Sequence, residues 1–298
     1  MAVGQADFGE TLWPGINRWY GLDYKQFDEQ YKDLFDVLSS TRAYEESQSL
    51  AGFGQIPVKP HGKSVAYADP AQGFKNRLIN ITYGLGFIIE KELYDDNQYE
   101  QVVRKFPTAL SRSVKNTVNT VGALVYDRAF NSLYTGADGL EMCSAVHLKK
   151  LGGTWSNEPS VAADLAEESL RQALIDIADF QDDAGLKMNL KAMKLIVAPE
   201  NDFRASKLLE SSLETQSANN DINPAKGRMP YVVNNFLTNT KYWFIRTSCQ
   251  DSLVFYWREK PDFTRDNDFD TRNAKYKTIY RMVCGWDDPR GIYGVPMT

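Results

Sequence analysis

Two stretches of the chain space their apolar residues three or four positions apart, as one face of a helix does. The first runs from Leu22 to Ser40, and the second runs from about residue 102 to residue 130. Pro107 is expected to kink or restart the second helix. From Thr108 to Leu133 alone this helix would be about 39 Å long at 1.5 Å per residue. The apolar stripe of the first helix predicts a surface that another protein covers.

Between these two stretches the pattern changes to chain breakers and then to alternation. Residues 51–73 are rich in Gly and Pro, which predicts a projecting loop. From Ile79 to Tyr83 apolar and polar residues alternate, which indicates a half-exposed strand. We expect two strands to frame the loop as a large hairpin. Residues 1–20 are rich in Gly and aromatic residues without a clean period, and we expect an extended arm there.

The rest of the chain combines an α/β portion with terminal strands. A helical spacing, a strand and a second helix follow one another in the middle third, and an exposed Ser/Asn-rich loop follows them. The last third alternates apolar and polar residues, which is typical of antiparallel strands. The segments are Leu165–Phe180 (helix), Met193–Ala198 (strand), a helix ending near Ser211, the loop 211–226, and strands at 242–245, 253–257 and 276–283. The pattern therefore predicts an α+β protein.

The composition is that of a globular protein with a negative surface. With 298 residues, 43% of them apolar, the chain should bury about three quarters of its unfolded surface. It has 34 Lys and Arg against 39 Asp and Glu, a formal charge of -5, which disfavours tight binding to nucleic acid. We find no apolar run of about 18 residues and no signal peptide, so we expect a soluble protein outside the membrane. The three cysteines form no CxxC pair, which favours reduced thiols.

One segment invites a catalytic or metal-binding interpretation. Residues 139–160 read GLEMCSAVHLKKLGGTWSNEPS and bring Cys143 within five residues of His147. A catalytic cysteine usually meets its histidine through the fold, and no third orienting group is indicated here. As metal ligands the two residues make half of a tetrahedral site, while Cys249, Cys284 and His61 are scattered singly. A loop that packs is therefore favoured, and a carboxylate dyad elsewhere stays open.

Two further motifs fail on their spacing. The alternating aspartates from 266 to 270 copy the start of an EF-hand loop, but Thr271 replaces the required glycine and Lys277 the required glutamate. Gly84-Leu-Gly86 begins a dinucleotide fingerprint, yet Ile89 occupies the third glycine position, and a strand bend is favoured. The sequence therefore assigns no catalytic, cofactor-binding or metal-ligating residue, and we expect no enzyme activity and no cofactor.

The order of elements resembles the major capsid proteins of tailed bacteriophages, from about Ile16 to Val295. Four segments carry the resemblance: TYGLGFIIEKELYDD from Thr82, MCSAVHLKKLGGTWSN from Met142, LIVAPE from Leu195 and TNTKYWFIR from Thr238. The second segment is similar to a loop that Mu-like head subunits carry, although Leu148 stands where proline is common. The matching residues are Met142, Cys143, Ser144, His147, Gly152, Gly153, Ser156 and Asn157.

The resemblance implies a Hong Kong 97-type fold in four parts. These are an N-terminal arm with its helix (1–55), an extended hairpin (56–88), a peripheral domain with a spine helix and a sheet (89–157 and 241–298), and an axial α/β domain (158–240). It implies that His147 belongs to a structural loop and not to an active site.

The resemblance also implies a function in the virion. The chain would self-assemble as hexamers and pentamers into an icosahedral shell around double-stranded DNA, which it would contact weakly and without sequence specificity. A separate scaffolding protein and a portal would be its partners, and no membrane is involved. The alternatives are an encapsulin-type nanocompartment of the same fold, a cysteine or carboxylate hydrolase, and a β-rich binding module.

Overall fold

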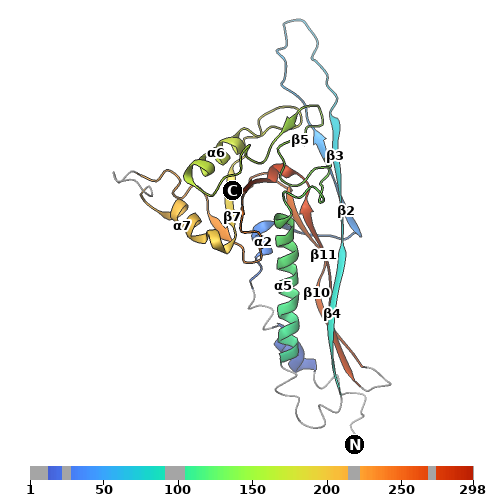
Figure 1. Ribbon diagram of the computed structural model, residues 1–298. Coiled ribbons are helices and arrows are strands. Elements are labelled where there is room, and N and C mark those ends of the chain that lie inside the picture. Colours follow the sequence, from blue (N-terminus) through green and yellow to red (C-terminus); the bar gives the residue numbers. More distant parts are fainter. Residues whose placement is uncertain (1–12, 22–27, 91–104, 214–221, 268–272, 298) are drawn as a thin grey trace, which may run out of the picture.

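The computed structural model describes residues 13–21, 28–90, 105–213, 222–267 and 273–297. A long four-stranded sheet and a helix form its spine (Figure 1). The strands lie in the order β1 (Asp36–Ser39), β10 (Leu253–Asn267), β11 (Ala274–Trp286) and β4 (Ile81–Ile89). β1 runs parallel to β10, and the other pairs are antiparallel.

Helix α5 (Lys105–Asp127) lies along the spine sheet (Figure 1). Its apolar residues at about four-residue spacing are buried, among them Leu110, Val114 and Val118. This face packs on aromatic residues of the sheet, such as Phe255 and Tyr280. No helix in the described part of the chain is long and apolar enough to cross a bilayer.

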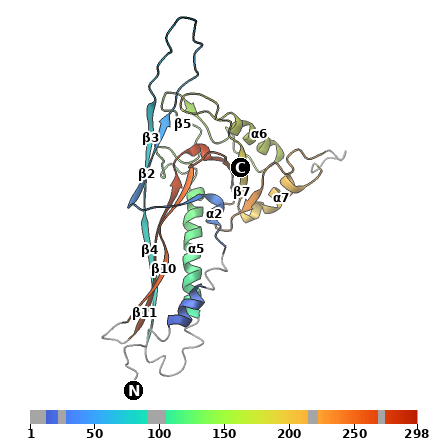
Figure 2. The same cartoon turned by 180° about the vertical axis from the view of Figure 1, so that it is seen from behind.

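A second sheet forms what we call the α/β domain. Its order is β12 (Ile292–Pro296), β9 (Tyr242–Thr247), β7 (Ala192–Val197) and β8 (Tyr231–Val233). One face of this sheet packs on α6 (Glu167–Ala178) and α7 (Asp202–Glu210), while the other face joins the cluster around α5. Short 3₁₀ turns at Pro199–Asn201 and Pro289–Gly291 precede α7 and β12. In Figures 1 and 2 this domain projects sideways from the spine.

A projecting hairpin leaves the body at one end of the spine. β2 (Tyr44–Ala51) pairs antiparallel with β3 (Ala71–Ile79), and residues 52–70 join them as a loop without regular structure. After Asn80 the chain continues directly as β4, which pairs with β11 in the spine sheet. A small hairpin of β5 (His147–Leu148) and β6 (Thr154–Trp155) lies at the junction of spine and α/β domain.

The helix predicted over Leu22–Ser40 is wrong over its described part. Only α2 (Tyr31–Leu34) is helical there, and the chain then enters β1 beside β10. The apolar stripe needs no second protein, because Tyr31, Leu34 and Phe35 are buried in the chain's own core. Backbone pairing of β1 with β10 outweighs the helical spacing here. A short apolar run fits either a helix or a strand, so its spacing does not determine the secondary structure.

The extended arm predicted for residues 1–20 is also wrong where the structure describes it. Residues 13–21 are helical, and Ile16 and Tyr20 are buried against Phe263 and Tyr276 of the spine sheet. By contrast, the long helix, the large hairpin, the middle α/β elements and the terminal antiparallel strands are confirmed. Pro107 causes no kink, because it lies in the first turn of α5, where its missing N–H is not needed.

Candidate functional site

Hydrogen bonds from several parts of the chain meet at one buried side chain, the amide of Asn157. Its Oδ1 accepts a hydrogen bond from the Ser144 N–H at 2.8 Å. Its Nδ2 donates to the carbonyl oxygens of Met142 at 2.8 Å, Pro289 at 3.0 Å and Ile292 at 3.3 Å. The Gly294 N–H donates to the Asn157 carbonyl at 3.0 Å. One side chain thus ties the loop after α5 to β12.

His147 is buried between Asn157 and Asp138. Its Nε2 lies 3.1 Å from Asn157 Oδ1, and its Nδ1 lies 2.6 Å from Asp138 Oδ2. Because Asn157 Oδ1 already accepts from a backbone N–H, Nε2 must donate to it. The contact between His147 Nδ1 and Asp138 Oδ2 then needs a second proton, which is held either by Nδ1 or by the carboxyl group. The pair is an ion pair or its neutral equivalent, with side chains 0% and 7% exposed.

Cys143 has the wrong electrostatics for a nucleophile. It is buried, and burial, with a smaller contribution from Glu158, raises the pKa of its thiol well above the usual range. A nucleophilic cysteine needs a lowered pKa and an electropositive, accessible surrounding. Both ring nitrogens of His147 are directed to Asp138 and Asn157, so no base is directed at the thiol. In this geometry Cys143 and His147 do not form a Cys–His dyad.

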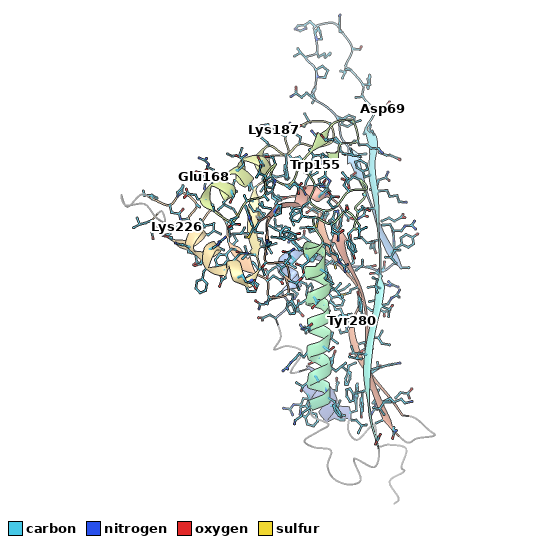
Figure 3. All side chains as sticks on the ribbon, in the orientation of Figure 1. Asp69, Trp155, Glu168, Lys187, Lys226 and Tyr280 are labelled. Atoms are coloured by element: carbon cyan, nitrogen blue, oxygen red, sulfur yellow. The ribbon has the colours of Figure 1, made fainter. Side chains whose placement is uncertain are left out.

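Arg290 lies in the 3₁₀ turn before β12 and packs against the residues around His147 through Trp155. It bonds Asp183 at 2.7 Å through Nη2 and Asp288 at 3.3 Å through Nη1, and its guanidinium lies 4.8 Å from the centre of the Trp155 ring. Burial alone would lower the pKa of Arg290, but the two carboxylates outweigh it and raise that pKa. Trp155, which is labelled in Figure 3, stacks on His147 with ring centres 4.8 Å apart.

Sequence reasoning identified one half of this junction and missed the other. His147 and Asn157 stood in the matched motif, whereas Asp138, Asp183 and Arg290 carried no signal. Their roles depend on chain reversals that bring distant segments together. Gly152 and Gly153 have φ angles of 105° and 88°, a region that favours glycine, and they form the turn between β5 and β6.

A cavity of about 700 Å³ beside the junction is one place where carboxylates come together. It is lined by Trp155, Glu158, Asp176, Asp179 and others. Burial raises the pKa of Glu158. Asp176, however, accepts a hydrogen bond from the Tyr293 hydroxyl at 2.6 Å, and Asp179 pairs with Lys187 at 2.6 Å. Two of the three carboxylates are thus engaged by the fold. Among the described residues no cluster of three or more His, Cys, Asp and Glu could hold a metal ion.

The loop of the projecting hairpin carries a group of strongly exposed apolar side chains. Ile56, Val58 and Tyr67 are 94%, 93% and 95% exposed, and Phe53 and Val65 are more than half exposed. Figures 1 and 2 show this loop extending away from the rest of the chain, with Asp69 at its base in Figure 3. Apolar side chains held in water in this way are typical of a surface that a partner covers.

Comparison with known families shows what kind of protein combines this buried polar junction with an exposed apolar loop. The family model described as phage capsid protein matches residues 81–295. The chain belongs to the phage capsid protein family. It is therefore a structural protein of the virion capsid and not an enzyme. The buried junction of this capsid protein holds the fold together, and its exposed loop is the candidate site of function.

Solved structures share the fold at low sequence identity. The mature capsid of bacteriophage PhiM1 is 8% identical, with 91% of this chain and 88% of that chain covered and a TM-score of 0.62. The bacteriophage JBD30 capsid is 12% identical over 70% and 90% of the two chains, with a TM-score of 0.55. A virus-like particle from Pyrococcus furiosus is 9% identical over 94% and 97%, with a TM-score of 0.51. Among curated proteins none matches the chain.

These likenesses confirm the α+β fold of Hong Kong 97 type that the resemblance implied. The cysteine or carboxylate hydrolase considered from the sequence is excluded by family membership. The aspartates from 266 to 270 extend beyond the described residues, which end at 267 in that strand.

Proposed function

We propose that this capsid protein is the major head subunit of a tailed phage, and that it self-assembles into an icosahedral shell around double-stranded DNA. Hexamers and pentamers of the same chain would form the shell. The motif from Met142 to Asn157 supports a head subunit of the Mu-like type. A portal would complete the head. A separate scaffolding protein would guide assembly.

The observation that carries the proposal is the exposed loop 52–70. In this segment the structure has one backbone hydrogen bond, from the Lys63 N–H to the Pro60 carbonyl at 3.3 Å. Its apolar side chains have no core of their own to enter. A large interface between copies would bury them and would add backbone partners. We propose that the loop lies on a neighbouring subunit, and that the α/β domain points toward the centre of the capsomer.

The net charge of -5 supports a container for DNA. A wall that neutralised many phosphates would bind duplex DNA strongly, and it would resist movement of the genome during packaging. We therefore propose that the shell contacts DNA weakly and without sequence specificity. Tight binding of duplex DNA to empty shells at physiological salt would contradict this part of the proposal.

The test is electron microscopy of the expressed protein, alone and with its scaffolding protein. Uniform closed shells or capsomer rings are expected, since repeated copies bury the exposed loops. A protein that stays monomeric under all these conditions would contradict the proposal.

A shell that stores protein cargo is the second candidate function. The likeness to the virus-like particle from Pyrococcus furiosus favours it, because that likeness covers nearly the whole of both chains. Particles purified from infected cells separate the two functions. Nuclease-resistant DNA of uniform length inside the particles is expected for a phage head, and a packaged enzyme without DNA would indicate the nanocompartment.

A further inference from the structure

Strand β4 lies at one edge of the spine sheet. The sheet order places β11 on one side of β4, and no described strand lies on its other side. The register of β4 with β11 is unbroken from Ile81 to Ile89. In an antiparallel pair every second residue of an edge strand directs its backbone N–H and C=O groups away from the sheet. Among the residues that the structure describes, no other backbone hydrogen bond involves residues 81–89, so these groups are open to a further strand.

This edge lacks the features that normally prevent a free edge from pairing. Natural proteins protect edges with charged residues, proline, an irregular register or a very short strand. Residues 78–89 read LINITYGLGFII, without a charge or a proline. Ile81, Leu85 and Ile88 are each more than half exposed. An uncharged, regular edge of nine residues with exposed apolar side chains is expected to take up a partner strand.

The other described edges are protected, which distinguishes β4 from them. β1 has four residues and β8 has three. The part of β10 beyond β1 contains Pro261 and several charged residues. β12 exchanges backbone hydrogen bonds with residues 157–163. The hairpin strands β2 and β3 shift their register after Gln48 and carry charged residues, namely Glu45, Glu46, Lys75 and Arg77.

The projecting loop contains a strand sequence without a strand beside it. Residues 64–68 read SVAYA, so Val65 and Tyr67 would share one side of an extended chain. Val and Tyr are both favoured in strands. The two side chains are 58% and 95% exposed. Within the described chain the backbone of residues 64–68 makes no backbone hydrogen bond, so this segment, like the edge of β4, lacks a neighbouring strand.

Residues 64–68 cannot reach β4 of their own chain. From Tyr67 to Ala71, where β3 begins, four residues span at most about 14 Å. β3 is nine residues long and spans about 30 Å, and β4 begins beyond its far end. Figures 1 and 2 show β3 and β4 following each other along one line, with the loop at the end away from β4. A strand that pairs with either segment therefore comes from another molecule.

A cavity beside β4 offers room for the side chains of an added strand. It has a volume of about 550 Å³ and lies between β4 and the last turns of α5. Ile81, Tyr83 and Val125 line it, and among the described residues of its lining only Arg128 is charged. Because side chains two residues apart share one face of a strand, both apolar side chains of the segment SVAYA would face this cavity from a strand added to β4.

We propose that residues 64–68 of one copy add as a strand to the outer edge of β4 in the next copy, with Val65 and Tyr67 over the cavity. The occupant is the loop of a second copy, because the same chain supplies a strand without an edge and an edge without a strand, and the length of β3 keeps them apart within one molecule. In strand addition the backbone hydrogen bonds provide affinity and the alternate side chains provide specificity. This inference rests on the proposed shell function and assigns the strand on which the loop lies.

Variants on both sides of the contact test the inference. Leu85→Lys places a charge on the free edge, at a residue 56% exposed. Tyr67→Ser removes the larger side chain of the added strand, and Tyr67→Phe is its conservative control. Phe203→Lys, at a residue 87% exposed on α7, controls for the loss of an exposed apolar side chain elsewhere. Circular dichroism checks that each chain folds, and sedimentation velocity with electron microscopy measures rings and shells.

We expect Leu85→Lys and Tyr67→Ser to lose rings and shells while the folded monomer persists, and Tyr67→Phe and Phe203→Lys to assemble. Hydrogen exchange locates the contact in shells of the unaltered chain. There, every second amide of residues 81–89 should exchange at least about 10-fold more slowly than in the free subunit, because the added strand bonds it.

Shells in which the loop amides slow while the amides of residues 81–89 exchange as in the free subunit would overturn the inference and leave the proposed function standing. Assembly of Leu85→Lys or Tyr67→Ser at the level of the unaltered chain would also overturn it, and so would equal loss in Phe203→Lys. If the unaltered chain itself forms neither rings nor shells, the proposed function fails instead.

Discussion

At the scale of single residues, the amide of Asn157 and the imidazole of His147 show how a short motif becomes a structural junction. The sequence could flag both residues, because they lie in one continuous segment. It could not supply Asp138, which the structure places 2.6 Å from His147 Nδ1. It could not supply the three carbonyl acceptors of Asn157 either, since two of them lie more than 130 positions away. These partners depend on tertiary structure.

The buried His147–Asp138 pair predicts strong energetic coupling. His147→Ala leaves the Asp138 carboxylate buried without its partner, and we expect a loss of about 3–5 kcal/mol in the free energy of unfolding. Asp138→Ala should be comparably destabilising. The double variant should lose clearly less than the sum of the two single losses, as measured by urea unfolding. Strictly additive losses would show that the two side chains do not act as a pair.

The thiol of Cys284 predicts a fall in stability at alkaline pH. Although part of this residue reaches the surface, its thiol is buried, and burial raises the pKa of Cys284 to about 12. An unfolded thiol ionises near pH ~8.5. Between these values the unfolded chain has lost a proton that the folded chain keeps, so the free energy of unfolding decreases as pH rises.

Replacing the Cys284 thiol should remove its contribution to the decrease in the free energy of unfolding at alkaline pH. In Cys284→Ala we expect the slope of the free energy of unfolding between pH 9 and pH 11 to be shallower, by up to about 1.4 kcal/mol per pH unit. Urea unfolding at several pH values measures both slopes. Equal slopes in the two proteins would show that the thiol ionises alike in the folded and unfolded chains.

At the scale of elements, periodicity predicted long segments well and short segments poorly. The apolar spacing from Leu110 to Val125 predicts a helix with one buried face. Helix α5 is that helix. The apolar spacing from Tyr31 to Leu38 is too short to distinguish a helix from a strand, and residues 36–38 become part of β1 beside β10. A strand before the loop was expected, but its residues were not located, because the sequence YEESQSLA of β2 is polar and pairs with β3 while both strands stay largely open to solvent. The hairpin loop was found because its Gly and Pro residues exclude regular structure.

The loop of the projecting hairpin should matter for assembly and not for folding. Ile56→Asp and Val58→Asp replace side chains more than 90% exposed, so the free energy of unfolding should change by about 0.5 kcal/mol or less. The double variant should nevertheless lose closed shells, because a carboxylate would be buried at the contact between copies. Thermal unfolding and electron microscopy check the two expectations. Lys59→Ala, on the same loop, is the control and should still assemble.

At the scale of the whole molecule, the chain divides its apolar surface between two uses. The spine and the α/β domain bury aromatic side chains such as Trp243, Phe244 and Phe255 in continuous clusters. The loop 52–70 leaves a group of apolar side chains in water, and so do scattered residues such as Phe203 and Leu133. From the sequence we expected both the hairpin and the apolar stripe of Leu22–Ser40 to be covered by another protein. For the stripe this was wrong, because periodicity shows that a face is apolar but does not show what covers it. The family match to residues 81–295 explains the division, since a capsid subunit meets copies of itself.

Hydrogen–deuterium exchange of the free subunit and of assembled shells tests this account most directly. In the free subunit the amides of residues 52–70 should exchange almost at the rate of an unfolded peptide, because their backbone is largely without hydrogen-bond partners. In shells the same amides should slow by at least about 100-fold, which corresponds to about 2.7 kcal/mol of local protection. Equal, fast exchange in both states would mean that the loop stays uncovered in the shell and would contradict the account.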